Sequence, residues 1–478
     1  MERLPHLLRQ RSRRFPALWL VLLVCLGACG GEDAVQAASR RPSYSGVVLV
    51  TLDTLRADHV GCYGYPRPTT PCLDRLAREG VLFTRALATT SLTAPSHAAI
   101  LTGLPPALHG VLDNGQELER GTLDLAELGA RGGYATGAFL STQFLRGVAG
   151  DFETVKVSDR AEKLVSGAAE WVEGLPPERP FLLWLHLYDV HQWTLEQRTP
   201  AAERAQLARE APLDDELFRR VAAELHGIDP GQGRSLEDVT LADMRGEHGQ
   251  PKTLAELRQD VERYDAQIRH ADLQVEHLYA RLRELRPGAP TLWIVTSDHG
   301  EGLAGHGYLG HGAHIYDEQL HVPLIVHASD GSVAPRRVDA LVQHLDLLPT
   351  LADVLGLPLP DDGRAREGRS LLELLRGVDG PDERRAFAQQ LTKGEPLGFA
   401  LQTARRKVLV SASGAREVYD LERDPLELVD RAGTPDAEER ALLDDLEQRL
   451  RAYRSAAPPS DGGEVSEEWA AELRALGY

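Results

Sequence analysis

The sequence predicts an α/β fold with a smaller C-terminal α+β subdomain. Three short runs, at residues 46–52, 181–187 and 291–296, are almost wholly apolar. Such runs are typical of strands that are buried on both faces of a sheet. An amphipathic pattern over 254–285, with apolar residues three or four apart, predicts one long helix that ends before Pro287.

The character of the chain changes after about residue 380. Short strand-like runs at 407–410 and 417–421 precede a predicted helix over 437–454. A stretch rich in Pro, Ser and Gly follows, and Ser466 is a suitable N-cap for a last short helix. These elements predict the C-terminal subdomain.

Composition limits the classes of function. The 478 residues are 42% hydrophobic and 26% charged, which is typical of a globular protein. Lys and Arg number 53 against 72 Asp and Glu, so the formal charge is −19. A chain that coats nucleic acid needs a basic surface, so we expect no nucleic-acid partner. Four cysteines are too few for a disulfide scaffold.

The first residues predict an export signal. A basic segment ending at Arg14 precedes an apolar run from Phe15 to Ala28, which is the pattern of a signal peptide. Leu26-Gly27-Ala28-Cys29 resembles a bacterial lipoprotein box, in which Cys29 would be acylated and become the first mature residue. A plain signal peptide with an incidental cysteine is the alternative. We expect secretion across the inner membrane and a lipid-anchored protein, periplasmic or at the outer membrane.

The expected divisions of the chain follow from these patterns. They are a signal peptide at 1–28, a tether at 29–43, a catalytic domain at 44–380 with an insertion or cap at 195–252, and the C-terminal subdomain at 381–478. In an oxidising compartment Cys62 and Cys72 either pair or remain two unrelated buried thiols, and the sequence leaves both readings open.

Acidic and histidine side chains follow each of the three predicted strands. Asp53 ends the first, Asp298 and His299 follow the third, and His191 comes shortly after the second. Ligands of α/β sheets bind at the carboxyl ends of the strands. Carboxylate and imidazole are ligands of divalent metals, so these residues are candidate metal or catalytic groups.

Thr93 is the candidate nucleophile. Pro95 stands where a helix could begin and Gly103 where it could end, which places Thr93 at the helix N-terminus. An anion is favoured there, and a hydroxyl beside a divalent metal can become an alkoxide. A plain N-cap role is the alternative. Three histidines within nine residues, His306, His311 and His314, also indicate a site, and we expect His306 to contact substrate.

At this point the sequence resembles the sulfatases, a family of the alkaline phosphatase superfamily. The resemblance runs over about residues 45–430, and its pieces stand in the family's order. They are LDTLRADH at 52–59, GCYGY at 61–65, TPCLDRLA at 70–77, TAPSH at 93–97, LTG at 101–103, LHGVLDN at 108–114, SDHGE at 297–301, GHG at 305–307, YDEQLHVPLI at 316–325, LDLLPT at 345–350 and VYDLERDP at 418–425.

The resemblance implies a large mixed sheet between helices. It also implies one divalent metal, held by Asp53, Asp298 and His299, with Thr93 as its next ligand. Ca, Mn, Zn and Mg all remain open as its identity, and relatives with a threonine nucleophile commonly use a second metal. Thr54 replaces an acidic ligand of many sulfatases.

Further roles follow from the resemblance. His97 falls where sulfatases carry an arginine beside the nucleophile, and His311 falls near their substrate-binding lysine. His191 falls at the histidine near the leaving group, and Asn114 at an asparagine that contacts the transferred group. Because histidine titrates near neutral pH, we expect His97 and His311 to make the charge of the site depend on pH, with activity falling as they deprotonate.

Thr93 is a departure from the family pattern. Sulfatases oxidise a Cys or Ser at this position to formylglycine, which a threonine cannot supply, so no formylglycine is expected. A threonine O-sulfate would hydrolyse slowly, whereas a threonine O-phosphate can be hydrolysed or passed to an acceptor. We therefore expect a hydrolase of phosphate mono- or diesters or of sulfate esters. The alternatives are a phospho-head-group transferase, a formylglycine-independent sulfatase, or an inactive substrate-binding lipoprotein. Expected substrates are small molecules or glycan or lipid esters.

Overall fold

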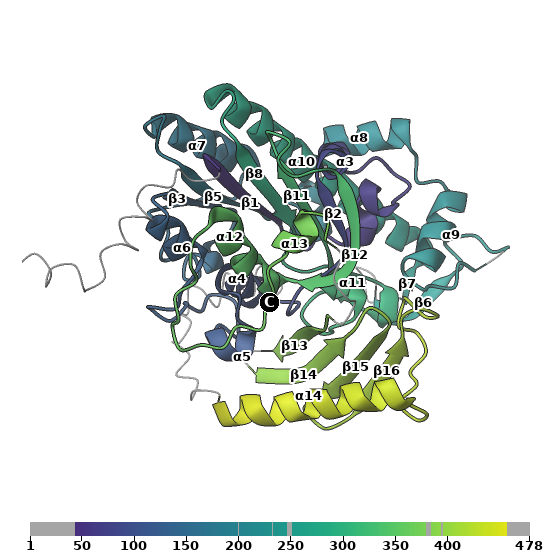
Figure 1. The fold of residues 1–478 in the computed structure, drawn as a ribbon. Coiled ribbons are helices and arrows are strands. Elements are labelled where there is room, and N and C mark those ends of the chain that lie inside the picture. The colour runs from purple at the N-terminus through teal and green to yellow at the C-terminus, as the bar shows by residue number, and fades with distance from the viewer. Residues whose placement is uncertain are drawn as a thin grey trace, which may run out of the picture. The chain divides into compact units, whose positions relative to one another are not determined.

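The computed structural model describes residues 44–456 apart from 199, 232, 246–250, 379–383 and 393–394. A mixed eight-stranded sheet in the order β12-β2-β11-β8-β1-β5-β3-β4 forms its centre (Figure 1). The strands are β1 (Gly46–Leu52), β2 (Val81–Leu87), β3 (Ala135–Leu140), β4 (Thr154–Val157), β5 (Phe181–Leu187), β8 (Thr291–Thr296), β11 (His321–Ala328) and β12 (Arg336–Gln343). The predicted α/β fold with a large mixed sheet is confirmed.

The three predicted strands are confirmed as β1, β5 and β8, and every residue in them is buried. β1 lies between the other two and pairs in parallel with both. The sheet is mixed because β11 runs antiparallel to β8 and to β2. Since β1, β5 and β8 are parallel, their carboxyl ends meet at one edge of the sheet.

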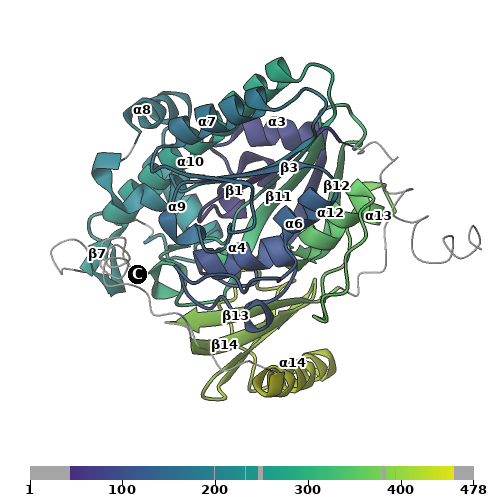
Figure 2. The same ribbon diagram turned by 90° about the vertical axis from the view of Figure 1, so that its left-hand side faces the viewer.

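Helices cover both faces of the sheet (Figure 2). Apolar residues of three helices, α3 (Pro71–Glu79), α7 (Ala161–Gly174) and α10 (Leu254–Leu285), pack on one face. The other face is covered by α4 (Thr93–Thr102), α6 (Leu125–Arg131) and α12 (Leu347–Leu355). The predicted long helix is confirmed as α10, which begins at a capping box of Thr253 and Glu256.

The segment predicted as an insertion contains two helices and a hairpin. These are α8 (Ala201–Glu210), α9 (Asp215–Glu224), β6 (Thr240–Arg245) and β7 (Pro251–Thr253). Apolar residues from this segment, including Phe218 and Val221, form a separate cluster with the first part of α10. Its role as a cap over the sheet edge stays a prediction.

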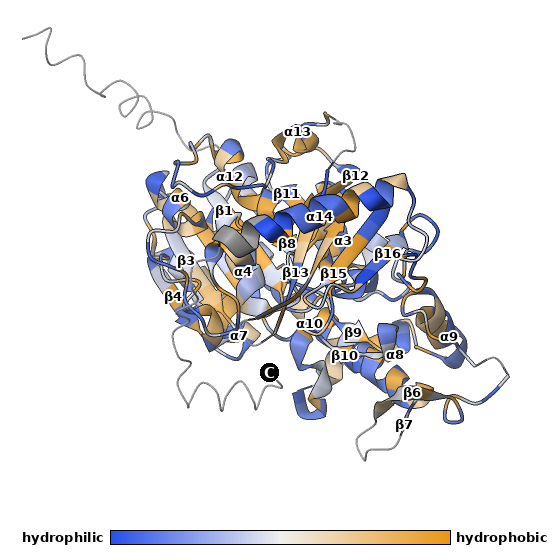
Figure 3. Cartoon of the chain, turned by 90° about the horizontal axis from the view of Figure 1, so that it is seen from below, coloured by the Kyte–Doolittle hydropathy of each residue, from blue (hydrophilic) through white to orange (hydrophobic). Residues whose placement is uncertain are grey.

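The C-terminal subdomain is an antiparallel sheet covered by one helix. Its strands are β13 (Ala386–Thr392), β14 (Glu395–Gln402), β15 (Arg406–Ser411) and β16 (Arg416–Asp420). The predicted helix over 437–454 is observed as α14 (Ala437–Ala456). Most of α14 is hydrophilic in Figure 3, and its Leu442 and Leu446 are buried against the sheet.

Short elements complete the described chain. They are η1 (Ala57–His59), η2 (Gly61–Tyr63), α5 (Pro106–His109), η3 (Gln143–Leu145), η4 (Val190–Thr194), η5 (Glu196–Arg198), β9 (Gly302–Leu303), η6 (Gly305–Gly307), β10 (Leu309–Gly310), α11 (Asp317–Leu320), η7 (His344–Asp346) and α13 (Leu372–Leu375). Across the described ranges, no helix is both long and apolar enough to cross a membrane.

Several sequence predictions concern thiols or the chain ends. Cys62 and Cys72 are both free thiols, so the disulfide alternative is not realised here. The signal peptide at 1–28, the acylated Cys29, the tether at 29–43 and the helix beginning at Ser466 lie outside the described residues.

Candidate active site

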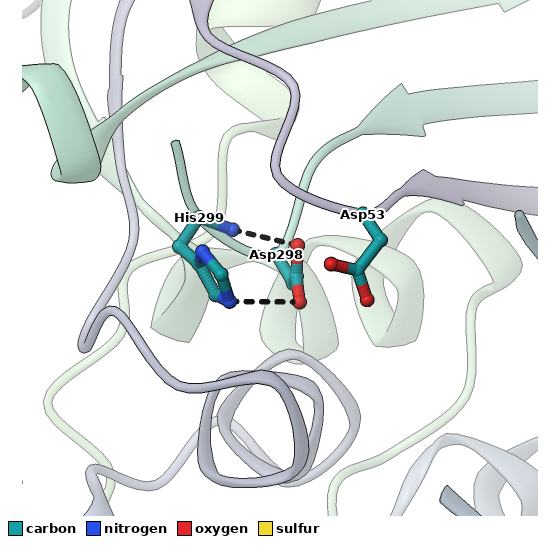
Figure 4. Close-up of side chains that lie close together, drawn as sticks. All are labelled: Asp53, Asp298 and His299. Atoms are coloured by element: carbon teal, nitrogen blue, oxygen red, sulfur yellow. Dashed lines mark hydrogen bonds and ion pairs between the residues drawn. The ribbon is translucent and has the colours of Figure 1, made fainter. Parts of the chain in front are cut away.

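Three candidate metal ligands converge at the carboxyl ends of β1 and β8 (Figure 4). Asp53 directly follows β1, and Asp298 and His299 follow β8. Because these strands are parallel neighbours, the two ends lie side by side. One ligand atom from each residue lies within 4.8 Å of the other two, and all three side chains are fully buried.

Each carboxylate keeps one oxygen without a hydrogen bond from the described residues. Asp53 Oδ2 contacts His186 Nε2 at 3.0 Å, but Oδ1 has no such partner. Asp298 Oδ1 accepts from the backbone N–H groups of Thr54 and His299, and Oδ2 has no such partner. Buried carboxylate oxygens left in this state are costly. Two such oxygens beside an imidazole nitrogen fit a divalent cation.

The electrostatics of the two carboxyl groups differ. Burial, and then the nearby charge of Asp298, raise the pKa of Asp53 well above its ordinary value. Burial alone would also raise the pKa of Asp298, but the neighbouring His299 and the hydrogen bond from the backbone N–H of Thr54 contribute to lowering that pKa. Two buried acids this close favour holding one proton between them, and a bound cation would replace that proton.

Hydrogen bonding determines the tautomer of His299. Its Nδ1 donates to the backbone oxygen of Gly300 at 2.9 Å. Nε2 is then the unprotonated nitrogen, and it lies 3.4 Å from Asp298 Oδ2 and 3.4 Å from Thr93 Oγ1. A neutral imidazole oriented by a backbone carbonyl is a common metal ligand.

The backbone at Thr54 supports Asp298. Thr54 has a φ of +59°, an uncommon conformation for a residue with a branched side chain. This turn directs its N–H to Asp298 Oδ1 at 3.1 Å, and the next N–H, of Leu55, donates to Ser297 Oγ at 2.9 Å. Ser297 Oγ in turn donates to the carbonyl of His299. The loop after β1 therefore holds the loop after β8 in place.

Thr93 is the first residue of α4, as predicted, and is fully buried. Leu92 before it is extended, and Gly103 ends the helix in the left-handed conformation at φ +65°. Thr93 Oγ1 lies 3.4 Å from His299 Nε2, which places the hydroxyl beside the three candidate ligands. The expectation of a plain N-cap is not met, because Leu92 holds the N-cap position.

Asn114 faces the first turn of α4. Its Oδ1 accepts the backbone N–H of Ala94 at 2.8 Å. This bond assigns Nδ2 as the free end of the amide, and Nδ2 is buried without a hydrogen-bond partner among the described residues. The amide is bonded to Ala94, the residue after Thr93, so its unused N–H donor suits an oxygen of a bound substrate.

His97 supports the backbone of Thr93 and does not act as a charged group. Its Nδ1 donates to the Thr93 carbonyl at 2.8 Å, and Thr51 Oγ1 lies 3.0 Å from Nε2. Trp184 Nε1 donates to the same hydroxyl at 3.0 Å, so Thr51 turns its hydrogen to Nε2. Burial lowers the pKa of His97 to about 3. The expectation that His97 titrates near neutral pH is therefore wrong, because the ring is neutral and satisfied.

His191 and His311 lie together beside His299. The His311 ring is 4.6 Å from the His299 ring and 4.8 Å from the His191 ring, between centroids. His191 stacks on Tyr188, whose hydroxyl lies 2.9 Å from Nε2. Burial, and then His311 and His299, lower the pKa of His191 well below its ordinary value. The catalytic roles predicted for both stay predictions.

The structure does not bring His306 to the three candidate ligands. Its ring stacks on Tyr316, its Nδ1 lies 3.4 Å from Glu318 Oε1, and its Nε2 lies 3.1 Å from the carbonyl of Glu427. It lines a cavity of about 420 Å³ between the main domain and the C-terminal subdomain. Substrate contact by His306 stays a prediction, and the positive φ of +51° at this residue helps to turn the loop.

Sequence reasoning missed two buried residues near the site. His186 is the one polar side chain within β5, and it contacts Asp53. Glu301 lies with Oε1 3.4 Å from His311 Nδ1, and its Oε2 accepts from Trp193 Nε1 at 2.9 Å. A histidine inside an otherwise apolar strand was a visible signal for His186. Glu301 is the last residue of the SDHGE motif at 297–301, and no role was assigned to it from the sequence.

Comparisons with known proteins find relatives along most of the chain. A family model described as Sulfatase matches residues 45–357, and one described as N-sulphoglucosamine sulphohydrolase, C-terminal, matches 305–456. A Delta 4,5-hexuronate-2-O-sulfatase of Bacteroides thetaiotaomicron is 27% identical, over 91% of this chain and 94% of that protein. The multifunctional alkaline phosphatase superfamily protein PehA of Trinickia caryophylli is 26% identical, over 85% and 95%.

A solved structure shows the same fold. The phosphonate monoester hydrolase of Agrobacterium radiobacter superposes with a TM-score of 0.63 at 22% identity, covering 90% of this chain and 99% of that one.

Proposed function

The chain belongs to the sulfatase family of ester hydrolases, and on this premise we propose that it is a metal-dependent hydrolase of phosphate-type esters with Thr93 as nucleophile. One observation carries the proposal: Thr93 Oγ1 lies 3.4 Å from His299 Nε2, beside two buried carboxylate oxygens that have no hydrogen-bond partner among the described residues. A hydroxyl in this position is suited to attack on an ester that the same centre holds.

Asp53, Asp298 and His299 would hold the divalent metal, with Thr93 next to it. When bound, the metal would lower the pKa of the Thr93 hydroxyl and offset the negative charge of the transferred group. Ca, Mn, Zn and Mg remain candidates, and a second metal stays a prediction.

The identity of the nucleophile favours phosphoryl transfer. In formylglycine, the hydrated aldehyde releases sulfate by collapsing to the aldehyde, whereas a threonine O-sulfate has no such route. A threonine O-phosphate is hydrolysed by attack of water at phosphorus. Phosphoryl transfer also relies mainly on positioning and electrostatic stabilisation, which a buried and well-oriented site supplies.

The residues of this chain then have distinct tasks. Thr93 Oγ, after its proton has passed to solvent, forms a bond to phosphorus as the bond from phosphorus to the leaving oxygen breaks. Asn114 Nδ2 donates to a non-bridging oxygen of the transferred group. His311 or His191 gives a proton to the leaving oxygen, and because burial lowers the pKa of His191, His191 can do so only at acidic pH. Water then attacks phosphorus and gives a proton to the same histidine, and phosphate or its monoester is released as the bond from phosphorus to Thr93 Oγ breaks.

Sulfate esters are the second candidate class. The support for them is the 27% identity to a sulfatase along 91% of the chain. A transferase that passes the phosphoryl group to an alcohol, and a binding protein without turnover, are further outcomes of the experiment below. If the lipoprotein box at Cys29 is processed, we propose a lipid-anchored enzyme of the periplasm or outer membrane that acts on glycan or lipid esters.

The test compares wild type with Thr93→Val, which keeps the branched shape and removes the hydroxyl. Thr102→Val, at the other end of α4 and also buried, is the matched control. Each protein is assayed with aryl phosphate monoesters, phosphate diesters, phosphonate esters and sulfate esters in the presence of each divalent metal. Mass spectrometry of acid-quenched enzyme seeks a modified Thr93.

The proposal expects phosphate or phosphonate turnover that falls at least about 10³-fold in Thr93→Val and is retained in Thr102→Val. Sulfate turnover by wild type would overturn the argument from threonine chemistry. Product that appears only with an added alcohol would indicate the transferase. Metal binding without turnover of any ester would favour the binding protein.

A further inference from the structure

We infer that His186 is a positioning residue for Asp53, the metal ligand at the end of β1. The inference rests on the proposed function, because it concerns how that metal centre is built. His186 lies in β5, opposite Thr51 of β1, and is fully buried. Its Nε2 lies 3.0 Å from Asp53 Oδ2, whereas Oδ1 of the same carboxylate has no hydrogen-bond partner among the described residues.

The surroundings of His186 determine where its hydrogen lies. The backbone N–H of Ser141 donates to Nδ1 at 3.3 Å, so Nδ1 is the acceptor nitrogen of a neutral ring. Nε2 then carries the hydrogen and donates it to Asp53 Oδ2. Both ring nitrogens are in use, which leaves no lone pair for a metal. His186 therefore acts through Asp53 and is not itself a ligand.

The strand backbone holds this donor rigidly. Ser141 Oγ donates to the carbonyl of His186 at 2.9 Å, and the N–H of Asp53 donates to the carbonyl of Leu187 at 2.9 Å. The His97 ring packs against the His186 ring edge-on, at 4.9 Å between centroids. With Oδ2 held in this way, the carboxylate can turn only Oδ1 toward His299 and Asp298. Groups that orient a metal ligand commonly contribute 10–100-fold to metal affinity, on the order of the effect expected here.

Substitution of His186 by glutamine or by asparagine distinguishes a positioning role from a role in packing alone. A glutamine amide reaches about as far as Nε2 and can donate to Asp53, whereas an asparagine amide reaches only as far as Nδ1 and keeps the Ser141 contact. His186→Gln therefore retains the proposed contact and His186→Asn removes it. His186→Met, which fills a similar volume without a donor, is a second variant that removes it. His327→Asn, a buried histidine of β11 bonded to Tyr279, is the matched control.

The readout is the dissociation constant for Mn²⁺, Ca²⁺, Zn²⁺ and Mg²⁺, measured by calorimetry on the metal-free proteins, together with their melting temperatures. We expect affinity to fall about 10–100-fold in His186→Asn and His186→Met, and to stay within about threefold of wild type in His186→Gln and His327→Asn. Wild-type affinity in any folded donor-less variant would overturn the inference. Equal losses in His186→Gln and His186→Asn at equal melting temperature would also overturn it.

Failure of the proposed function gives a different result. If wild type binds metal but hydrolyses no ester, the function fails while the His186 comparison still stands. If wild type binds no divalent cation, both the metal centre and the inference are wrong.

Discussion

His97 donates its Nδ1 hydrogen to the backbone carbonyl of Thr93 across 2.8 Å, one helical turn earlier in α4. The bond ties the candidate nucleophile to Thr51 and Trp184 in the sheet, through the other ring nitrogen. Where the family carries an arginine, this chain therefore has a neutral group that holds the nucleophile's backbone. A neutral imidazole here gives the site one positive charge fewer than an arginine would.

The first prediction concerns this anchor. We expect His97→Leu to lower kcat about 10–100-fold, because a small displacement of a nucleophile has effects of that size. His97→Asn can still donate to the Thr93 carbonyl and should retain most of the activity. Because burial holds the pKa of His97 near 3, the pH–rate profiles of wild type and His97→Asn should coincide between pH 5 and 8. If an ionisation seen in the wild-type pH–rate profile is absent from that of His97→Asn, the assignment of His97 as a neutral ring is wrong.

The second prediction concerns metal removal. Chelation should lower the melting temperature of wild type, and saturating divalent metal should restore it, because a cation that binds only the folded state stabilises it. At 100 times the dissociation constant the gain is about 2.7 kcal/mol. Asp298→Asn should abolish this response, since it removes one of the buried carboxylates. If the melting temperature of Asp298→Asn responds to chelation and to metal as wild type does, the metal binds at another site.

The third prediction concerns the joint between the two subdomains. Lys407 of β15 is fully buried, with Nζ 2.8 Å from Asp317 Oδ1 and 2.7 Å from Glu427 Oε1. Lys407→Met would leave both carboxylates buried without a cation, so we expect a loss of at least about 3 kcal/mol in unfolding free energy by urea titration. The exposed pair of Arg131 and Glu127 is the control, and Arg131→Met should change stability by less than about 1 kcal/mol.

The fourth prediction concerns stability in acid. Burial lowers the pKa of His109 to about 3, whereas an unfolded histidine titrates near 6.5. Between these values the unfolded chain binds a proton that the folded chain does not, so stability falls as the pH falls. His109→Asn retains an acceptor for the N–H of Val111 and removes the titration. Between pH 7.5 and 5, wild type should lose about 2 kcal/mol more than the variant. Equal losses of stability in wild type and variant would show that His109 takes up its proton in the folded state as it does in the unfolded chain.

Local sequence patterns were sufficient to predict the elements that carry several of the site residues. The strand that precedes Asp53 and the strand that precedes Asp298 were recognisable as apolar runs, and Thr93 was recognisable by the proline and glycine around it. These features depend on residues within a few positions of one another. The same reasoning could not orient His306, because its loop turns it toward Glu427, which is 121 residues away in the chain.

Three strands of the central sheet, the long helix and the polar residues that follow those strands could be predicted from the amino-acid sequence, because backbone periodicity is a short-range property. The packed fold was needed to show which oxygen of Asp53 has no hydrogen bond from the described residues, which ring nitrogens of His299 and His97 donate, and that His186 contacts Asp53. These properties depend on hydrogen bonds between residues far apart in the chain, such as Thr93 with His299 at a separation of 206 residues. In a buried site the partner of each polar atom determines its chemistry, and partners are assigned by packing.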